Sequence, residues 1–226
     1  PPAGMQLVIS TDTLVAGRHF PLNTDAYSIG WKAAAVNLSD IAAMGAKPHS
    51  LLLALSLPAV DEVFLSDFSR GLFDLCAQHG VRLIGGDTTK GPMAFTLTVQ
   101  GFVNRGQALQ RSGAKVGDRI FCSGSIGDAA AGLQLLLDKE KGSSQQVQLG
   151  YQLTLAEQEF LISRHQRPTA RVELGKQLAN IASSCIDLSD GLASDLIHVL
   201  KASSLNALTE TKLVADIELT QLPVSI

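Results

Sequence analysis

Three apolar segments of this chain end in acidic side chains, and this repeated ending constrains the fold more than any other feature. The segments MQLVISTD, VRLIGGD and SSCID each read as a short strand. Asp12, Asp87 and Asp187 stand at their ends, and Asp190 follows in the stretch IDLSDGL. Ligands of open α/β sheets bind beyond the carboxyl ends of strands. One such aspartate alone is more often a turn former or a helix cap, but the recurrence predicts a shared site.

A further acid, Asp40, falls on a helix that the sequence predicts over residues 25–44. Asn23 or Thr24 is expected to cap this helix, and Gly45 to end it. At about 100° per residue, Asp40 lies on the same stripe of the helix as the apolar residues Ile29, Ala33 and Val36. It is therefore either an exposed acid in the last turn or a ligand of a metal ion, or of a metal-bound water, at a buried helix end.

These aspartates offer oxygen ligands and no soft ones. The five histidines show no HxH or HExxH spacing, and the three cysteines form no CxxC pair. Hard oxygen ligands, few per ion, suit a magnesium ion that keeps waters and bridges phosphates. Asp187 and Asp190 would repel each other unless a positive charge lay between them, and we expect that charge to be the metal.

The remaining pattern predicts an α+β protein with two domains. In the first half we expect strands at 5–12, 49–58, 81–87 and 93–103, and a second helix from Asp61 to Gly80. A glycine-rich polar stretch, 104–118, marks the boundary between domains at 1–106 and 107–226. In the second half we expect strands at 119–124, 183–187 and 213–223, alternating with helices that include 127–139, 155–165, 170–181 and 193–203.

Charge and composition indicate which partners to expect. The net charge is −3 without long basic runs, so we expect no nucleic-acid partner. The longest apolar run, Leu51 to Val60, is too short to span a bilayer, and no signal peptide is recognisable, so we expect neither a membrane partner nor secretion. Few, scattered cysteines are typical of a cytoplasmic protein.

Two glycine-rich turns could approach a phosphate. The first, GGDTTKGP, combines Gly86 and Asp87 with Lys90, whose ammonium group could contact phosphate. The second, GSIGDAAAGL, either cradles a phosphate at a helix start or is a plain structural turn. No GxxxxGK[ST] sequence occurs, so a P-loop is excluded.

Five motifs in this order resemble those of one enzyme family: STDTLVAGRHF, WKAAAVNLSDIAAMGAKP, LIGGDTTKGP, RSGAKVGD and IDLSDGLASDL. The family is that of the thiamine-monophosphate kinases, within the superfamily of aminoimidazole ribotide synthetase and selenophosphate synthetase. The resemblance implies phosphorylation of thiamine monophosphate to thiamine diphosphate by ATP. It also implies an N-terminal sheet domain that forms a homodimer and a C-terminal α/β domain. The family's Gly-Asp-Asp and Gly-Gly-Glu-Asp-Tyr segments do not occur among these 226 residues.

The resemblance also implies roles for individual residues. Magnesium-site residues are expected at Ser10, Thr11, Asp12, Asp40, Asp87, Asp187 and Asp190, of which Asp12, Asp187 and Asp190 are the expected catalytic residues. Nucleotide contacts are expected at Gly86, Asp87, Arg111 and Ser189. His19 is the expected substrate contact, although without the family it would read as an exposed loop histidine, and Arg111 as an ordinary surface arginine.

The implied chemistry does not require a general base. A phosphate monoester has a second pKa of about 6 and is largely a dianion at neutral pH, so the difficulty is bringing one anion onto another. Bound metal ions invert the local charge, and catalysis of a direct in-line transfer is then positioning and charge neutralisation. Two alternatives stay open: a sister enzyme of the superfamily that uses ATP on another acceptor, and a nucleotide-binding subunit without turnover.

Overall fold

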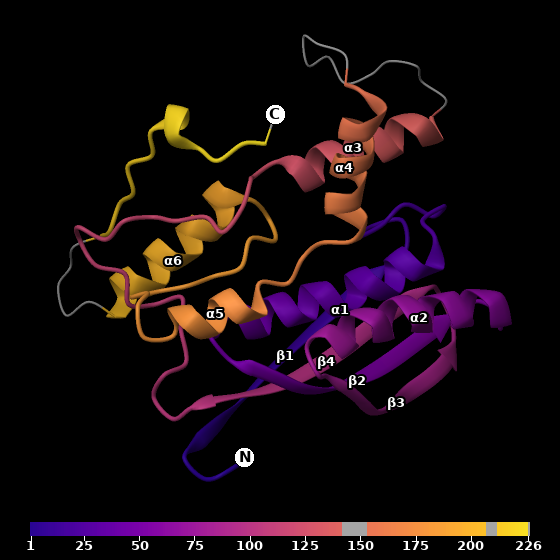
Figure 1. Ribbon diagram of the computed structural model, residues 1–226, viewed down its shortest axis with the longest axis horizontal. Helices are drawn as coiled ribbons and strands as arrows, with labels where there is room; N and C mark the ends of the chain where they lie inside the picture. The colour runs from indigo at the N-terminus through magenta and orange to yellow at the C-terminus, as the bar shows by residue number, and fades with distance from the viewer. Residues whose placement is uncertain (142–152, 207–211, 226) are drawn as a thin grey trace.

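A computed structural model describes residues 1–141, 153–206 and 212–225 of the chain. A four-stranded sheet with helices on one of its faces forms the first half, and helices joined by long irregular segments form the second (Figure 1). In chain order, the elements are β1 (Met5–Val15), α1 (Ala26–Ala43), β2 (Lys47–Leu57), α2 (Glu62–Gln78), β3 (Arg82–Lys90), β4 (Ala94–Asn104), α3 (Asp128–Glu140), α4 (Leu155–Gln166), α5 (Val172–Leu178), α6 (Leu192–Asn206) and a 3-10 turn at Leu219–Gln221.

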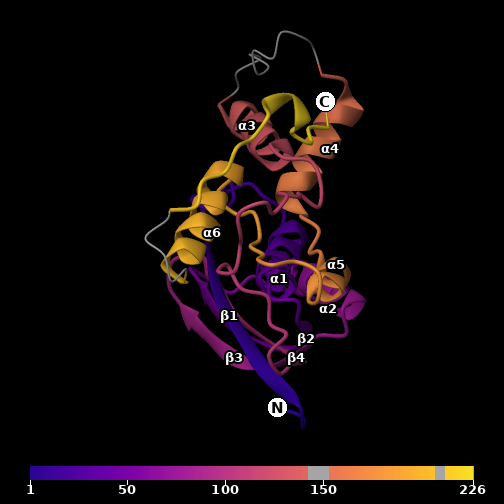
Figure 2. The same ribbon diagram turned by 90° about the vertical axis from the view of Figure 1, so that its left-hand side faces the viewer.

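The sheet has the strand order β1-β4-β2-β3. Strand β4 is antiparallel to both of its neighbours, whereas β2 and β3 are parallel. Phe95, Leu97 and Val99 alternate with half-buried residues along β4, which confirms the alternation expected for this strand. These side chains and those of Val8 and Leu14 in β1 are buried under the helices, while the opposite face of the sheet carries none of the described helices (Figure 2).

Helix α1 is the central element of the molecule. Ile29 and Ala33 are buried, as the apolar stripe predicts, and Leu38 and Ile41 on other faces of the helix are fully buried as well. Asp25 is the N-cap, since its Oδ1 accepts a hydrogen bond of 2.8 Å from the Ser28 amide. The expected cap at Asn23 or Thr24 is therefore wrong by one or two residues. An N-cap side chain accepts a hydrogen bond from the amide two or three residues further along the chain, and Asp25 stands at that distance from Ser28.

The end of α1 agrees with expectation. Gly45 follows the helix with φ of +66°, in the left-handed region where a side chain would be strained. The Gly45 amide donates to the carbonyl of Ala42, and the Ala46 amide to that of Ile41, so the last helical carbonyls are satisfied before β2 begins.

Helices α1 and α2 cross in close contact through two glycines. A Cβ atom on Gly30 would lie 2.0 Å from the carbonyl oxygen of Phe68, and one on Gly71 would lie 2.0 Å from that of Tyr27. The contact is reciprocal, because each glycine faces the backbone of the other helix. The two backbones can approach this closely only where neither helix carries a side chain at the crossing point.

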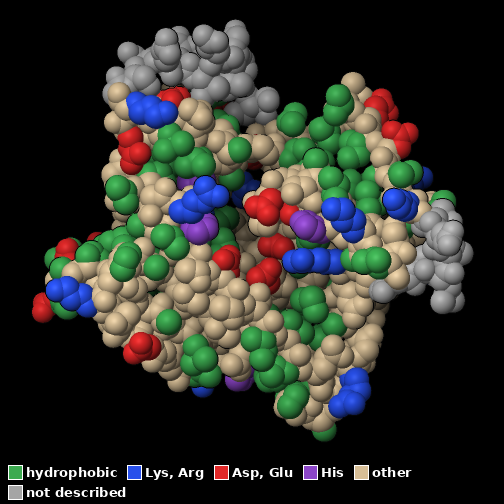
Figure 3. Space-filling model, turned by 180° about the vertical axis from the view of Figure 1, so that it is seen from behind, with side chains coloured by type: hydrophobic (Ala, Val, Ile, Leu, Met, Phe, Trp, Pro, Cys, Tyr) green, Lys and Arg blue, Asp and Glu red, His purple; other side chains and the backbone are tan. Residues whose placement is uncertain are grey.

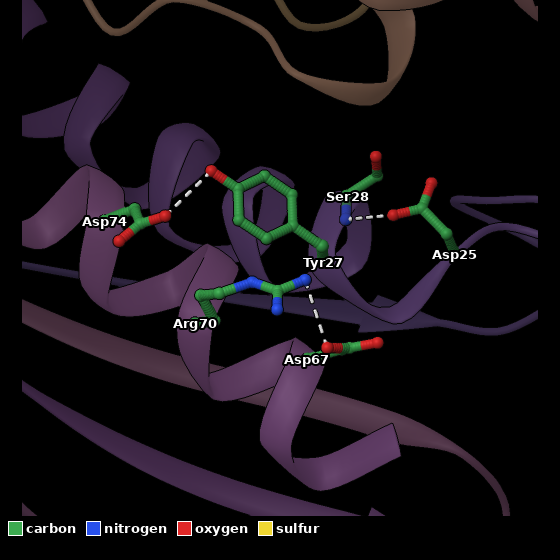
Figure 4. Close-up of polar contacts among 6 residues, drawn as sticks. All are labelled: Asp25, Tyr27, Ser28, Asp67, Arg70 and Asp74. Carbon is green, nitrogen blue, oxygen red and sulfur yellow. Dashed lines mark hydrogen bonds and ion pairs between the residues drawn. The ribbon is translucent and has the colours of Figure 1, made fainter. Parts of the chain in front are cut away.

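Polar contacts line the exposed rim of the same crossing (Figure 4). The Tyr27 hydroxyl donates to Asp74 at 3.0 Å, and the guanidinium carbon of Arg70 lies 5.4 Å from the centre of the Tyr27 ring. Arg70 also forms an ion pair of 3.1 Å with Asp67. These exposed pairs contribute little energy individually, so the buried glycine crossing rather than the rim holds the two helices together.

The second half differs from expectation in its strands. None of the three segments expected as strands there, 119–124, 183–187 and 213–223, is a strand among the described residues. Single backbone hydrogen bonds join Cys185 to Gln110 and Ile126 to Pro223, at 2.9 and 2.8 Å. A strand needs several successive bonds to a neighbour, and these segments have no continuous partner. The helices α3, α4 and α6 are confirmed, and α5 is shorter than expected.

Two side chains of α1 bind the connection that contains α4 and α5. The Trp31 indole donates to the Pro168 carbonyl at 3.0 Å. The Lys32 ammonium lies 3.2 Å from Nε2 of His165 and donates to the His19 carbonyl at 3.0 Å. Burial lowers the pKa of Lys32 to about 8. Burial, reinforced by the Lys32 charge and opposed by a hydrogen bond to Ala129, lowers the pKa of His165 to about 4.

None of the helices in the described residues is long and apolar enough to cross a membrane.

The glycine crossing generates the first prediction. Gly30→Ala should destabilise the protein by about 1–3 kcal/mol, because the new methyl group collides with backbone that cannot move without parting the helices. A relaxed helical site would show the opposite sign, since alanine is favoured over glycine by about 0.5–1 kcal/mol. Urea unfolding measures the difference, and Ser66→Ala, on the exposed face of α2, serves as the control. A Gly30→Ala variant as stable as the parent would contradict the close crossing.

The buried His165 generates the second prediction. Its folded-state pKa of about 4 lies below the ordinary value of 6.5, so the unfolded chain binds the proton more tightly between these values. Stability is therefore lost as the pH falls from 6.5 towards 4, and this group alone should account for about 2 kcal/mol between pH 7 and pH 5. In urea unfolding at both pH values, His165→Gln should lose less stability on acidification than the parent does. The control His198→Gln, with an exposed side chain, should behave like the parent.

Candidate functional site

A cavity of about 190 Å³ lies between the sheet domain and the second half of the chain. Asp12 of β1 and Asp40 of α1 line it from one side, and Arg111, Asp187 and Ser189 line it from the other. A second cavity of about 420 Å³ adjoins it, shares Asp40, Arg111 and Asp187, and has a more apolar wall. In the view from behind, acidic side chains gather in a hollow in the middle of the molecule, with basic and histidine side chains beside them (Figure 3).

The alternation of β1 brings two of the polar residues to this cavity. Val8 and Leu14 of β1 are buried under the helices, and Ser10 and Asp12 share their face because side chains of a strand alternate. Ser10 Oγ donates to Oδ2 of Asp40 at 2.5 Å. This bond joins the middle of β1 to the last turn of α1, so Asp40 is a half-buried acid with a hydroxyl partner rather than a free surface acid.

Strand β1 continues past the point where the sequence suggested its end. It runs to Val15 and pairs with β4 as far as Ala94, so Asp12 lies within the strand, opposite Leu97. The expectation that Asp12 ends its strand is wrong, because pairing with β4 outweighs the low strand propensity of the acid. The Asp12 carboxylate accepts a hydrogen bond of 2.6 Å from the Thr13 amide.

Asp187 is an acid in an unfavourable environment. Burial raises its pKa, the negative charge of Asp40 raises it further, and a hydrogen bond from Ser39 works in the opposite direction. Asp40 and Asp187 both line the cavity, so two acids share it. Two like charges brought together at a solvent-accessible cavity form a site where a cation lowers the energy of the protein.

The polar side chains at the cavity indicate which kind of metal ion they could bind. The side chains of Ser10, Asp12, Asp40, Asp187 and Ser189 offer only oxygen atoms. Nowhere in the described ranges do three or more His, Cys, Asp or Glu side chains come together closely enough to hold a metal ion. The Asp40–Asp187 pair fits magnesium, which binds through one or two carboxylates and keeps several waters.

Asp190 and Asp87 are not brought to this cavity. Asp190 is exposed and lies outside both cavity linings. Asp87 lies within β3 at the far edge of the sheet, about 14 Å from β1 at the usual spacing of about 4.8 Å between strands. It pairs with Ala54, which places its side chain on the face turned away from the helices. The sequence suggested one site for all the aspartates, but the strand order separates Asp87 from the cavity, and Asp190 is exposed in the loop before α6.

The neighbours of Asp87 in β3 are also far from the cavity, because the whole strand is exposed at the edge of the sheet. Strand β3 was expected to be a short buried strand that ends at Asp87, yet it is exposed along its length and continues to Lys90. As an edge strand on a sheet with one uncovered face, it has few neighbours to bury it. Thr11 also faces this side, where its hydroxyl lies 2.9 Å from that of Thr98. Thr11, Gly86, Asp87 and Lys90 are therefore not part of the cavity in this chain.

His19 lies in the connection between β1 and α1 and has an exposed side chain. Its Nδ1 accepts a hydrogen bond of 2.9 Å from the Val15 amide. Because Nδ1 is used by this bond, Nε2 is the ring nitrogen that stays available to a ligand. The Lys32 ammonium binds the His19 carbonyl at 3.0 Å, which holds this connection against α1.

The glycine-rich turn before α3 is a structural turn. Asp128, at the first position of the helix, is 5 % exposed. Its carboxylate accepts hydrogen bonds from Ser125 and, at 2.6 Å, from Ser225, and Arg164 lies 3.7 Å away. These side chains fill the helix start, so of the two interpretations that the sequence left open, the structure favours the one without a phosphate.

Three groups that hold the site were not among the residues expected from the sequence. Ser39 and Lys32 contact residues distant in the sequence, and no local pattern signals such contacts. Asp195 is 2 % exposed and binds the backbone of the Ser189–Gly191 loop. It lies within the conspicuous stretch IDLSDGLASDL, where an acid among apolar helical residues was an available signal.

Comparisons with known proteins agree with this architecture. Residues 1–103 match the family model of the AIR synthase related protein, N-terminal domain. The chain is 50 % identical over 206 residues to the thiamine-monophosphate kinase of Escherichia coli K12, and 46 % identical over 225 residues to that of Haemophilus influenzae. These matches cover 91 % and 99 % of this chain but 60 % and 62 % of the relatives, so the chain spans somewhat less than two thirds of their length.

Solved structures of the same family have the same fold. The thiamine-monophosphate kinase of Stenotrophomonas maltophilia superimposes with a TM-score of 0.82 at 48 % identity, over 90 % of this chain and 63 % of that one. AaThiL in complex with AMPPCP and TMP superimposes with a TM-score of 0.79 at 32 % identity, over 89 % of this chain and 62 % of that one. The α+β architecture expected from the sequence is thereby confirmed, and the chain belongs to the thiamine-monophosphate kinase family of the AIR synthase superfamily.

Proposed function

We propose that the protein to which this chain belongs phosphorylates thiamine monophosphate to thiamine diphosphate with ATP. One observation carries the proposal: in a chain about half identical to named kinases, two carboxylates and an arginine from the two halves line one cavity. A related structure holds AMPPCP and TMP, which supports both substrates. The alternative of a non-catalytic nucleotide-binding subunit is less favoured, because Asp12, Asp40 and Asp187, three of the expected magnesium-site residues, line one cavity.

The residues of the cavity suggest how each would act. Asp40 and Asp187 would hold magnesium, with Asp12 and Ser10 completing the site through the Ser10–Asp40 hydrogen bond. When bound, magnesium supplies positive charge against the phosphates. Arg111 would bind a phosphoryl oxygen from the other wall, and Ser189 would contact the nucleotide. His19 would offer its Nε2 hydrogen to the substrate, as a donor and not as a base.

The acceptor phosphate is already ionised at neutral pH, so in this proposal no side chain has to remove a proton. The chain must instead align donor and acceptor for in-line transfer and keep their charges apart until they react. A cavity built from two separate halves of the chain suits this task, because each half can hold one of the two anions. The division into a 1–106 domain and a 107–226 domain forms part of the proposal.

A homodimer formed through the sheets is also part of the proposal. The uncovered face of the sheet carries Leu7 and Ile9 of β1, which are 41 % and 55 % exposed. Exposed apolar side chains on a continuous strand surface are typical of an interface. Thr11, Gly86 and Asp87 would lie at or beside this interface, which accounts for their distance from the cavity.

A test of the activity follows directly. The full-length protein should release ADP in the presence of magnesium and thiamine monophosphate, measured by a coupled assay. Other acceptors, including aminoimidazole ribotide precursors and selenide, distinguish a sister enzyme of the superfamily. ATP binding without ADP release from any acceptor would favour the non-catalytic alternative.

The carboxylate pair generates the third prediction. Asp40→Asn and Asp187→Asn should each reduce turnover at least about 100-fold, or about 2.7 kcal/mol of transition-state stabilisation, because each removes a charge-stabilising group. Without metal, Asp187→Asn should be as stable as the parent at pH 7 or more so. A raised folded-state pKa means that the ionised acid opposes folding above its ordinary value of 3.8.

A second readout for the same variants does not depend on turnover. Magnesium should raise their melting temperatures less than it raises that of the parent, since binding to the folded state is weaker. Asp61→Asn is the matched control, because Asp61 caps α2 far from the cavity and asparagine caps about equally well. Near-parental turnover and magnesium shifts in both cavity variants would overturn the metal assignment.

The open sheet face generates the fourth prediction. Leu7→Lys should convert a dimer into a monomer, because it places a charge at the proposed apolar interface, and Leu7 lines neither cavity. Val63→Lys, at a 73 % exposed position on α2, is the matched control and should leave the mass unchanged. Light scattering measures both, and a parent that is monomeric at micromolar concentration would refute the interface.

A further inference from the structure

Helix α6 carries two buried polar side chains that face the cavity loops. Asp195 is 2 % exposed and Ser203 is 4 % exposed. They stand eight residues apart, a little over two helical turns, so they lie on neighbouring parts of one helix face. Buried polar groups on a helix need partners, and both find theirs in backbone outside the helix.

Asp195 binds the loop that precedes the helix. Its Oδ2 accepts hydrogen bonds from three successive amides, those of Ser189, Asp190 and Gly191, at 3.0, 3.1 and 3.2 Å. Gly191 has φ of +107°, a conformation that other residues rarely adopt, which lets the chain turn so that the three amides converge. No ion pair among the described residues includes Asp195, so these amides are what stabilises its charge.

Ser203 binds the other loop of the cavity. Its Oγ accepts hydrogen bonds from the amides of Gly113 and Ala114 at 3.2 and 3.1 Å, and donates to the carbonyl of Arg111 at 3.3 Å. One hydroxyl therefore uses both its donor and its acceptor capacity on a single turn of backbone. Gly113 has φ of +127°, and the carbonyl of Ser183 lies 2.4 Å from where its Cβ would stand, so this turn has little freedom to move.

The two loops held in this way are those that supply the cavity wall of the second half. Ser189 and Arg111 both line the cavity opposite Asp12 and Asp40. Neither loop is part of a helix or a sheet, so secondary structure does not set its position. Hydrogen bonds from the backbone of both loops to side chains of helix α6 can set their positions instead.

We propose that Asp195 and Ser203 are positioning residues: through α6 they set the separation and orientation of Ser189 and Arg111 for binding and reaction of the phosphoryl donor. The proposal rests on the proposed function for its kinetic consequence, while its structural part stands on the hydrogen bonds alone. Neither residue contacts the cavity itself, so both act through the loops. A small displacement of a positioning group can cost about 100-fold in rate.

The first experiment reads the loops directly and needs no activity. Amide hydrogen exchange of the full-length protein is compared between the parent, Asp195→Ala and Ser203→Ala. Asp195→Ala should raise exchange at residues 189–191 and Ser203→Ala at residues 113–114, each by at least about tenfold, since the amide loses its acceptor. Unchanged exchange at these amides in both variants would overturn the proposal.

The second experiment separates positioning from stability. Val199→Ala is the matched control, because Val199 is a buried apolar residue of α6, 7 % exposed, and its truncation destabilises the helix without removing a polar anchor. At a temperature where all variants are folded, Asp195→Ala should lower kcat/KM for ATP about 100-fold and Ser203→Ala about tenfold. Val199→Ala should stay within about threefold of the parent.

Conservative variants complete the test. Ser203→Thr and Asp195→Asn keep an oxygen acceptor, and each should recover most of the loss seen with alanine. A Val199→Ala variant that loses as much activity as Asp195→Ala, or rescue variants no better than alanine, would show a merely structural role and overturn the proposal. If the parent shows no kinase activity, the proposed function fails, and hydrogen exchange alone still decides whether α6 positions the loops.

Discussion

The fold depends on helix α1, which is buried between the sheet and the helices α2 and α5. Its apolar side packs on the strands, its glycine crosses α2 at backbone distance, and Trp31 and Lys32 bind the second half of the chain. The same helix ends at Asp40, so the element that organises the core also delivers an acid to the cavity. Ala170 and Val172 from the α5 region complete this core, which ties the two halves to one helix.

The sequence predicts well what depends on local spacing. The positions of α1, α2 and β4 follow from periodicity, and helical phase alone placed Asp40 beside the core. The predictions that were wrong concern segments whose structure depends on pairing with distant parts of the chain. The end of β1 is set by β4, nearly ninety residues later, and the exposure of β3 is set by its place at the edge of the sheet. The expected strands of the second half failed because strand propensity does not supply a neighbouring strand.

The residues of the candidate site also divide into those that the sequence indicated and those that depend on contacts between distant segments. Asp40, Asp187, Arg111 and Ser189 meet as the resemblance implied, whereas Asp87 and Asp190 do not join them. The groups that hold the site in shape were not foreseen, because Lys32, Asp195 and Ser203 act on backbone rather than through a recognisable motif. Backbone atoms are the same at every residue, so contacts to them leave no mark on the partner's sequence.

Strand β1 serves two surfaces at once. Its even-numbered side chains, Ser10 and Asp12 among them, face the cavity, and its odd-numbered ones, such as Ile9 and Thr11, face the open side of the sheet. Because the alternation has a period of two, deleting one residue between Ser10 and Asp12 would turn one of the two side chains to the opposite face of the sheet. The composition of either face can therefore vary independently, but the spacing between Ser10 and Asp12 cannot change by a single residue.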